Sequence, residues 1–242
     1  MAVLSLLHTG DMHNRLSVAA ARRLGELREQ HRALLLDSGD AVGAGNVTFR
    51  RSEPILTRMN VAGYTAMAVG NREYFFRKRG LIHKTREAQF AVLGANLHPN
   101  HGDLGHIQPW VTVTAPTGER VGILALARTM IRPGHPWAAL ADTHFVPWQI
   151  AAQEAAAALR GQVDWLVALS HLGRADDGRL VALLPEIDVV LGGHDHPATG
   201  GIEQVGPTLI SRAAPYAKSV TLIMMTRQGD TRQYESSVIE LP

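Results

Sequence analysis

The sequence predicts an α/β sandwich, because short apolar runs alternate along the chain with longer segments of helical periodicity. Near the amino terminus, apolar runs at 2–7, 33–37 and 65–69 each precede an amphipathic segment. This alternation is typical of strands that are joined by helices. The chain has 242 residues and 45% apolar content, enough for one large core, so we expect a single domain over residues 1–242.

The amphipathic segments of the amino-terminal half predict the helices. The helical period is clear at 15–31, and segments around 53–63 and 75–88 take the same place after the next two apolar runs. A further apolar run at 90–97 predicts the strand that follows. Each predicted strand is therefore joined to the next by a predicted helix.

From residue 110 onward the pattern contains more strands. Two β-rich runs on either side of Thr117 and Gly118 predict a hairpin, and 146–162 predicts a helix with Gly161 near its end. Two buried strands and a final antiparallel set of three strands are expected from apolar runs at 164–170, 188–193, 208–213, 219–227 and 233–241.

Composition excludes several classes of site. The 24 basic and 22 acidic residues leave a net charge of only +2, so we expect neither nucleic acid nor a membrane as a partner. There is no cysteine, which excludes disulfides and thiolate sites, so any metal must be held by His, Asp, Glu or Asn. The first apolar run is shorter than the roughly 7 to 15 residues of a signal-peptide core. We therefore expect a cytoplasmic chain.

Polar residues that can bind a metal follow the apolar runs repeatedly. They are Asp11 and His13, Asp40, Asn71, His171, and His194 with His196. In open α/β sheets the ligand crevice lies at the carboxyl ends of the strands, so separate loops can deliver these side chains to one place. One such residue alone is a weak signal, but the whole ordered series is a strong one.

The series GDMH, DSGD, GNRE, SHLG and GGHDH resembles the calcineurin-like metallophosphoesterase family over residues 3 to about 200. Within that family it is most similar to the catalytic domain of 5'-nucleotidases and 2',3'-cyclic-nucleotide phosphodiesterases. The resemblance implies a four-layer α/β/β/α sandwich of two mixed β-sheets flanked by helices. It also implies two divalent metal ions.

The resemblance assigns the metal ligands to the residues after the apolar runs: Asp11, His13 and His196 for one ion, Asn71, His171 and His194 for the other, and Asp40 as the bridge. Oxygen ligands with imidazoles and no thiolate suit Mn, which we expect first, or Fe, Zn, Ni or Co. Asn71, Arg72 and His171 are the expected catalytic residues. Asn71 and Arg72 are also expected to bind the substrate phosphoryl group.

We expect a dinuclear metal-dependent phosphoesterase that hydrolyses a phosphodiester or phosphomonoester by direct attack of a metal-bridging hydroxide. The expected substrate is a nucleotide or a similar small phosphate ester. A 5'-nucleotidase-like phosphomonoesterase is one alternative, and a catalytically silent metal-binding or scaffold module is another. All the ligand positions are filled in this sequence, which argues against the silent module.

Arg72 departs from the family pattern, which has a histidine at this position. An arginine cannot act as a general acid, but its planar fork can hold two phosphate oxygens. We therefore expect a preference for substrates whose leaving group needs little protonation. His98 or His135 is an alternative proton donor; the simpler interpretation takes His98, His101 and His106 as solvated loop residues.

Two further features bear on the substrate. The basic residues at 77–79 follow Tyr74, Phe75 and Phe76, and we interpret the aromatic residues as core and the basic ones as a solvated face. The 5'-nucleotidases carry a further carboxyl-terminal domain that holds the base. This sequence ends at Pro242, so we do not expect nucleotide specificity to follow from the fold alone.

Overall fold

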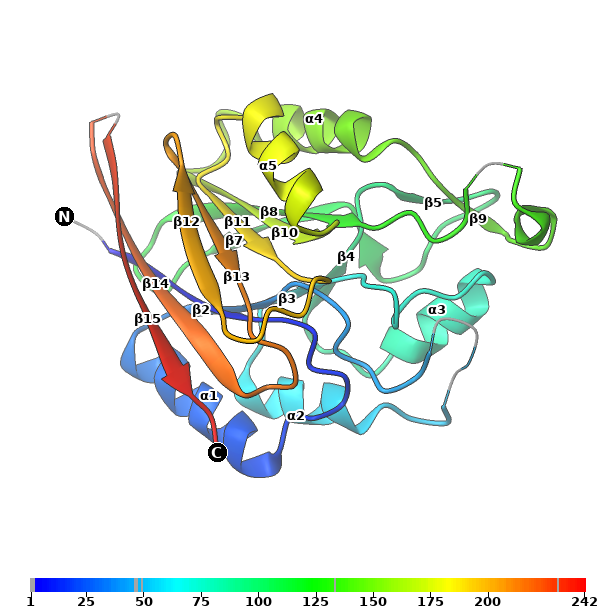
Figure 1. Ribbon diagram of the computed structural model, residues 1–242, viewed down its shortest axis with the longest axis horizontal. Coiled ribbons are helices and arrows are strands. Elements are labelled where there is room, and N and C mark those ends of the chain that lie inside the picture. Colours follow the sequence, from blue (N-terminus) through cyan, green and yellow to red (C-terminus); the bar gives the residue numbers. More distant parts are fainter. Residues whose placement is uncertain (1–2, 46–47, 49, 133, 230) are drawn as a thin grey trace.

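The computed structural model describes residues 3–45, 48, 50–132, 134–229 and 231–242. Two mixed β-sheets pack face to face, and helices cover their outer faces (Figure 1). The helices of the first sheet are α1 (Val18–Gln30), α2 (Pro54–Ala62) and α3 (Lys78–Thr85), and those of the second are α4 (Trp148–Leu159) and α5 (Arg174–Leu183). This arrangement confirms the predicted sandwich of two mixed sheets flanked by helices.

The first sheet has seven strands in the order β15-β14-β1-β2-β3-β4-β6. Its parallel part runs from β1 to β6, and the antiparallel hairpin of β14 and β15 joins it at β1. Its strands are β1 (Leu4–Thr9), β2 (Leu34–Asp37), β3 (Ala66–Ala68), β4 (Ala91–Leu93), β6 (Ile107–Gln108), β14 (Ser219–Gln228) and β15 (Thr231–Glu240).

The second sheet has six strands in the order β12-β13-β11-β10-β8-β7, with antiparallel strands at both edges. Its strands are β7 (Trp110–Thr114), β8 (Arg120–Ala127), β10 (Trp165–His171), β11 (Val189–Gly192), β12 (Gly201–Val205) and β13 (Thr208–Arg212). A small antiparallel sheet pairs β5 (Leu97–Pro99) with β9 (Thr143–Phe145), and a short 3-10 helix, η1, spans Pro136–Ala139.

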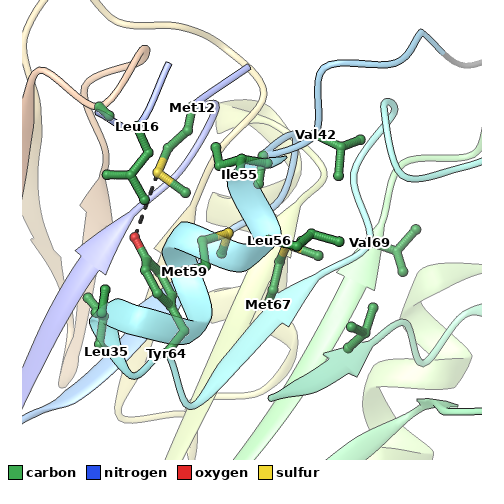
Figure 2. Close-up of a cluster of buried hydrophobic side chains, with 14 of the residues drawn as sticks. Met12, Leu16, Leu35, Val42, Ile55, Leu56, Met59, Tyr64, Met67 and Val69 are labelled. Atoms are coloured by element: carbon green, nitrogen blue, oxygen red, sulfur yellow. Dashed lines mark hydrogen bonds between the residues drawn. The ribbon is translucent and has the colours of Figure 1, made fainter. Parts of the chain in front are cut away.

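The core forms layers that match the alternation of side chains along the strands. Leu6 and Leu36 of the first sheet lie in one buried cluster with Val167 and Leu169 of the second, between the two sheets. On the opposite face of the first sheet, Leu35 and Met67 pack against α1 and α2, and Figure 2 shows this cluster around Tyr64 and Met12. The hydroxyl of Tyr64 donates to Met12 Sδ at 3.6 Å.

Local signals explain where the first helices begin and end. Ser17 caps α1, because its Oγ accepts from Ala20 N at 2.9 Å. Pro54 stands at the start of α2, where a missing N–H costs nothing, and Gly63 ends the helix with a φ of 76°. The predicted helix boundaries are therefore close to those in the structure.

The prediction of three antiparallel strands at the carboxyl terminus is wrong. β14 and β15 do form an antiparallel hairpin, but β13 lies in the other sheet, where it pairs in parallel with β11. The first four residues of β13 are buried, as expected for an interior strand of a covered sheet. Which sheet such a strand joins depends on long-range packing, and its apolar run carries no information about that choice.

Candidate metal centre

The predicted ligands lie in loops at the carboxyl ends of strands from both sheets. Asp11 follows β1, Asp40 follows β2 and Asn71 follows β3 in the first sheet. His171 ends β10, and His194 follows β11, in the second sheet. Because the strands that bear them are parallel within each sheet, their loops gather at one edge of the sandwich.

One compact cluster contains Asp11, His13, Asp40 and His196. One ligand atom from each of these residues lies within 4.8 Å of the others. His13 Nε2 lies 3.6 Å from Asp40 Oδ2, and His196 Nε2 lies 3.1 Å from Asp11 Oδ1. The carboxylates of Asp11 and Asp40 are both buried, so this cluster can hold a divalent cation.

The remaining predicted ligands surround the other side of Asp40. His171 Nε2 lies 3.4 Å from Asp40 Oδ1, and the rings of His171 and His194 meet edge to face with centroids 5.3 Å apart. Asn71 is the neighbour of Arg72, whose backbone N–H donates to Asp40 Oδ1 at 2.7 Å. Asp40 therefore stands between His13 on one side and His171 on the other.

Three buried polar atoms in this region fit bound metal. Among the described residues, His13 Nε2, Asn71 Oδ1 and His171 Nε2 have no hydrogen-bond partner. Buried polar atoms are nearly always satisfied, so unpartnered donor atoms from three different loops fit the ligand set of a metal ion. His171 Nδ1 lies 2.8 Å from Ser38 O and must donate to it, so Nε2, which faces Asp40, is the ring nitrogen available to a metal ion.

The backbone around the cluster adopts conformations that few residues tolerate. Asp11, His13, Asp40, His194 and His196 all have positive φ, between 48° and 79°. Asp and His enter the left-handed region more readily than most residues, and such strain gathers at functional sites. The strain is local to the loops that carry the predicted ligands.

Glycines allow the loops to approach one another. A Cβ on Gly70 would lie 2.4 Å from Asp40 N, and one on Gly193 would lie 2.9 Å from Ser38 Oγ and 3.1 Å from Asp11 Oδ2. Both positions are therefore closed to larger residues. This explains the glycine before Asn71 and the glycine before His194.

Glu73 holds two of the loops together. Its buried carboxylate accepts from Gly70 N and Asp40 N at 2.9 Å and from Val42 N at 3.0 Å. Glu73 precedes α3, which begins only at Lys78, and its carboxylate positions Asp40 through the backbone of that residue.

Burial and neighbouring charges shift the pKa values of the titratable groups in the cluster. Burial alone would lower the pKa of His171, but the neighbouring Asp40 carboxylate raises that pKa to about 9. Burial would raise the pKa of Asp40, but the neighbouring His171 ring lowers that pKa to about 2. The pKa of His194 is lowered by burial and then by the positive charges of His171 and Arg128.

Arg72 is half-buried beside Asp40. Its backbone N–H binds the Asp40 carboxylate, and its Nη1 donates to Gly43 O at 3.3 Å. Lys84 is almost fully buried, and its Nζ donates to Arg72 O at 2.8 Å as well as to Gly45 O and Tyr74 O. The main chain of Arg72 is therefore fixed on both sides of its Cα.

The candidate alternative proton donors do not belong to this cluster. His98 lies in β5, half-buried, with Nε2 3.1 Å from Ala95 O, so its assignment as a solvated loop residue is wrong. His135 caps η1, because its Nδ1 accepts from Trp137 N. His101 and His106 are exposed loop residues, as expected, and His106 Nε2 lies 2.9 Å from Thr85 Oγ1.

The aromatic residues after Arg72 are core, as predicted. Tyr74 and Phe75 are buried in the cluster that faces α1 and α2, and Phe76 packs against it. Arg77 and Arg79 are exposed. The structure therefore supports the assignment of this segment as core and solvated face.

Tyr216 is a member of the site that sequence reasoning missed. Its ring packs edge to face on His13, with centroids 5.5 Å apart, and on His196 at 5.8 Å. Its N–H donates to Asp11 O at 2.9 Å, and it has a φ of 70°, which is rare for a bulky residue. Arg15 lies over the outer face of the ring. No local motif marks Tyr216, because it reaches the site only through the packing of distant segments.

Comparisons with known proteins identify one matching family model and several relatives. The family model described as calcineurin-like phosphoesterase matches residues 4–198. The chain is 29% identical over 221 residues to the snake venom 5'-nucleotidase of Gloydius brevicauda, covering 79% of this chain and 36% of that protein. It is 26% identical to the trifunctional nucleotide phosphoesterase YfkN of Bacillus subtilis, over 89% of this chain and 17% of that protein.

A solved structure shares the fold. The 5'-nucleotidase precursor from Thermus thermophilus superposes with a TM-score of 0.82 and 26% identity, covering 99% of this chain and 54% of that one. The chain spans about a third of the length of the snake venom relative, because the match covers 36% of that protein. Within the part of the chain that the structure describes, no helix is both long and apolar enough to span a membrane.

Proposed function

Because the chain belongs to the calcineurin-like phosphoesterase family, we propose that it hydrolyses a phosphodiester or phosphomonoester at a dinuclear metal centre. Family membership and the 5'-nucleotidase relatives indicate a hydrolase acting on phosphate esters. The observation that carries the dinuclear proposal is that buried, unpartnered atoms occur on both sides of Asp40, at His13 Nε2 and at His171 Nε2.

The proposed ligands divide between two ions as the family pattern implies: Asp11, His13 and His196 for one, Asn71, His171 and His194 for the other, and Asp40 for both. Two divalent ions, when bound, lower the pKa of water and neutralise phosphoryl charge. Mn²⁺ is the first ion to test, with Fe, Zn, Ni and Co as alternatives, since oxygen and imidazole donors suit all of them.

The chain's own residues supply binding and orientation. Arg72 lies beside Asp40 with its main chain fixed, and its guanidinium can hold two phosphoryl oxygens. The hydrogen bond from this guanidinium to Gly43 O is a long one of 3.3 Å, which substrate can replace. Asn71 also contacts the phosphoryl group in this proposal. Arg72 stabilises charge and transfers no proton.

The proposed substrate is a nucleotide or a similar small phosphate ester. This follows from the relatives named as 5'-nucleotidases and as a nucleotide phosphoesterase. The same relatives favour a second candidate, a 5'-nucleotidase-like phosphomonoesterase. The preference between a diester and a monoester follows from the leaving group, because a site without a general acid favours leaving groups that need little protonation.

The proposal is tested by hydrolysis of bis-aryl phosphate, mono-aryl phosphate and a panel of nucleotides, with and without added Mn²⁺. We expect metal-dependent turnover, which Asp40→Asn lowers by about 10³ or more because it removes the bridging charge. Glu235→Gln, on the exposed face of β15, is the control and should keep wild-type activity. If two metals are bound and no ester turns over, the chain is a silent metal-binding or scaffold module.

Two expectations from the sequence remain predictions. A single domain over residues 1–242 predicts that limited proteolysis leaves one protected fragment of nearly full length. A cytoplasmic location predicts that the protein follows cytoplasmic markers when cells are fractionated.

A further inference from the structure

A cavity lies next to the candidate metal centre. It has a volume of about 310 Å³, and we call it the Arg128 cavity. Its lining residues are Arg128, Thr129, Arg132, Trp148, Leu172 and Asp176. None of them is a predicted ligand, and the family resemblance assigns no role to any of them.

Two residues that line the cavity directly follow the paired residues His171 and Ala127. Leu172 directly follows His171, and Arg128 directly follows Ala127, which pairs with His171 across β8 and β10. Arg128 Nη1 donates to Leu172 O at 3.4 Å, so its guanidinium lies across the end of β10. A molecule bound at His171 and His194 can therefore extend into the Arg128 cavity.

The buried side chain of Asn96 fixes the backbone next to Arg128. Asn96 is fully buried, and its side chain exchanges two hydrogen bonds of 2.8 Å with the backbone of Ala127. Its backbone carbonyl accepts from Val146 N at 3.0 Å, two residues before α4 begins. Asn96 thus fixes the residue before Arg128 relative to the start of α4, where Trp148 forms a buried wall of the cavity.

The charges of the cavity favour an anion. Arg128 and Arg132 are exposed and contribute two guanidinium groups, whereas the lining contains one acid, Asp176. That carboxylate is already paired with Arg179 at 3.0 Å. The lining also includes the first residue of α4 and the third residue of α5, and the amino-terminal ends of helices carry partial positive charge.

We propose that the Arg128 cavity binds a second anionic group of the substrate, so that the preferred esters carry a phosphate or carboxylate besides the phosphoryl group that is hydrolysed. This inference rests on the proposed phosphoesterase function. Nucleoside diphosphates and dinucleotides are the chemical classes that fit, because a second phosphate lies a few atoms from the first. Arg128 is in this view a specificity residue.

The test compares ADP with AMP, which share base and sugar and differ in one phosphate. In the Mn²⁺-loaded protein, Arg128→Gln should lower kcat/KM for ADP about tenfold more than for AMP, the usual effect of one charge-assisted hydrogen bond. Arg132→Gln should act in the same direction. Arg160→Gln removes an exposed charge at the far end of α4 and should leave the ratio unchanged. An unaltered ratio in both cavity variants overturns the proposal.

A binding measurement separates this proposal from the proposed function. If neither nucleotide is hydrolysed, pyrophosphate is titrated into the Mn²⁺-loaded protein while tryptophan fluorescence is followed, with Trp148→Phe identifying the signal from the cavity. Saturable binding that Arg128→Gln weakens about tenfold, and Arg160→Gln does not, supports the cavity even when the phosphoesterase proposal has failed. No binding in the wild type, or equal binding in Arg128→Gln, overturns the cavity.

Discussion

At the scale of single residues, the candidate site depends on side chains that hold the main chain as much as on the predicted ligands. Glu73 binds the N–H groups of Gly70, Asp40 and Val42. Lys84 donates to the backbone carbonyl groups of Gly45, Arg72 and Tyr74. One anion and one cation thus fix the loops that carry Asp40 and Asn71.

Arg72 determines the first prediction. Without a general acid, kcat/KM should fall steeply as the pKa of the leaving group rises, so aryl phosphates should exceed alkyl phosphates by about 10² or more. Arg72→His should reduce this dependence and gain activity on alkyl monoesters, because an imidazolium can donate a proton. The measurement is kcat/KM for a series of phosphate monoesters while chemistry limits the rate. A series with no slope in the wild type would contradict the assignment of Arg72.

Lys84 gives the second prediction. Lys84→Met should lower the free energy of unfolding by about 3 kcal/mol, because the buried carbonyls of Gly45, Arg72 and Tyr74 lose their donor. It should also lower kcat, because the main chain of Arg72 is released. Urea unfolding and steady-state kinetics measure the two effects. Lys218→Met, at an exposed lysine, is the control. Unchanged stability and kcat would show that Lys84 has no positioning role.

At the scale of secondary structure, the ends of the strands are tied to the helices that follow them. Ser170, one residue before His171, donates from Oγ to Asp177 Oδ1 of α5 at 2.6 Å. Asp177 is buried, and Arg212 of β13 lies 3.7 Å from its Oδ2. The end of β10 and the start of α5 therefore form one unit with β13 of the second sheet.

Asp177 gives a prediction for pH. Burial raises the pKa of Asp177 to about 6, despite the opposing hydrogen bond from Ser170 and the charge of Arg212. A raised carboxyl pKa means that the folded state binds the proton more tightly than the unfolded chain. The contribution of this group to stability is therefore present below about pH 4 and is lost as the pH rises through 6, by up to about 3 kcal/mol.

Replacing the titrating group tests this assignment. Asp177→Asn should flatten the fall in stability between pH 4 and 6, because the amide keeps an acceptor for Ser170 and does not ionise. Glu235→Gln, at an exposed acid of β15, is the control and should keep the wild-type slope. Urea unfolding at several pH values measures both. The same slope in wild type and Asp177→Asn would rule out Asp177 as the cause.

At the scale of the whole molecule, the two sheets meet at the predicted ligands. His8 of the first sheet links them beneath the site, because its Nδ1 lies 2.9 Å from Ser211 Oγ in β13 and its Nε2 lies 3.2 Å from Ser38 Oγ. Burial lowers the pKa of His8 to about 3, so it is neutral. Above it, Asp11 and Asp40 from the first sheet face His196 and His171 from the second.

Metal binding should therefore stabilise the assembled sandwich. At Mn²⁺ concentrations about 100 times the dissociation constant, linkage adds about 2.7 kcal/mol, which should raise Tm by about 5 to 10 °C for a chain of this size. Scanning calorimetry with increasing Mn²⁺ measures the shift, and a chelator should reverse it. Asp40→Asn should reduce the shift, whereas Glu235→Gln should keep it. A Tm that does not respond to any of the candidate metals would contradict the metal centre.

The sequence alone determined the alternation of strands and helices and the order of the polar motifs. These are local properties: a period of two or 3.6 residues, a capping residue such as Ser17, and polar residues at the end of apolar runs are all encoded within a few positions. The absence of cysteine restricted the metal donors in the same direct way. An α/β sandwich and the delivery of the polar loops to one place follow from these signals, whereas the two mixed sheets and the central place of Asp40 were implied by the family resemblance.

Only the tertiary structure decided which sheet receives β13, which amides Glu73 binds, how Tyr216 reaches His13, and that Arg128 and Trp148 line one cavity. Each of these depends on contacts between segments that are distant in the chain. A continuous apolar run fits the interior of either sheet, and a buried acid can serve any nearby donor. The choice among these options is made by packing, which no local pattern in the sequence records.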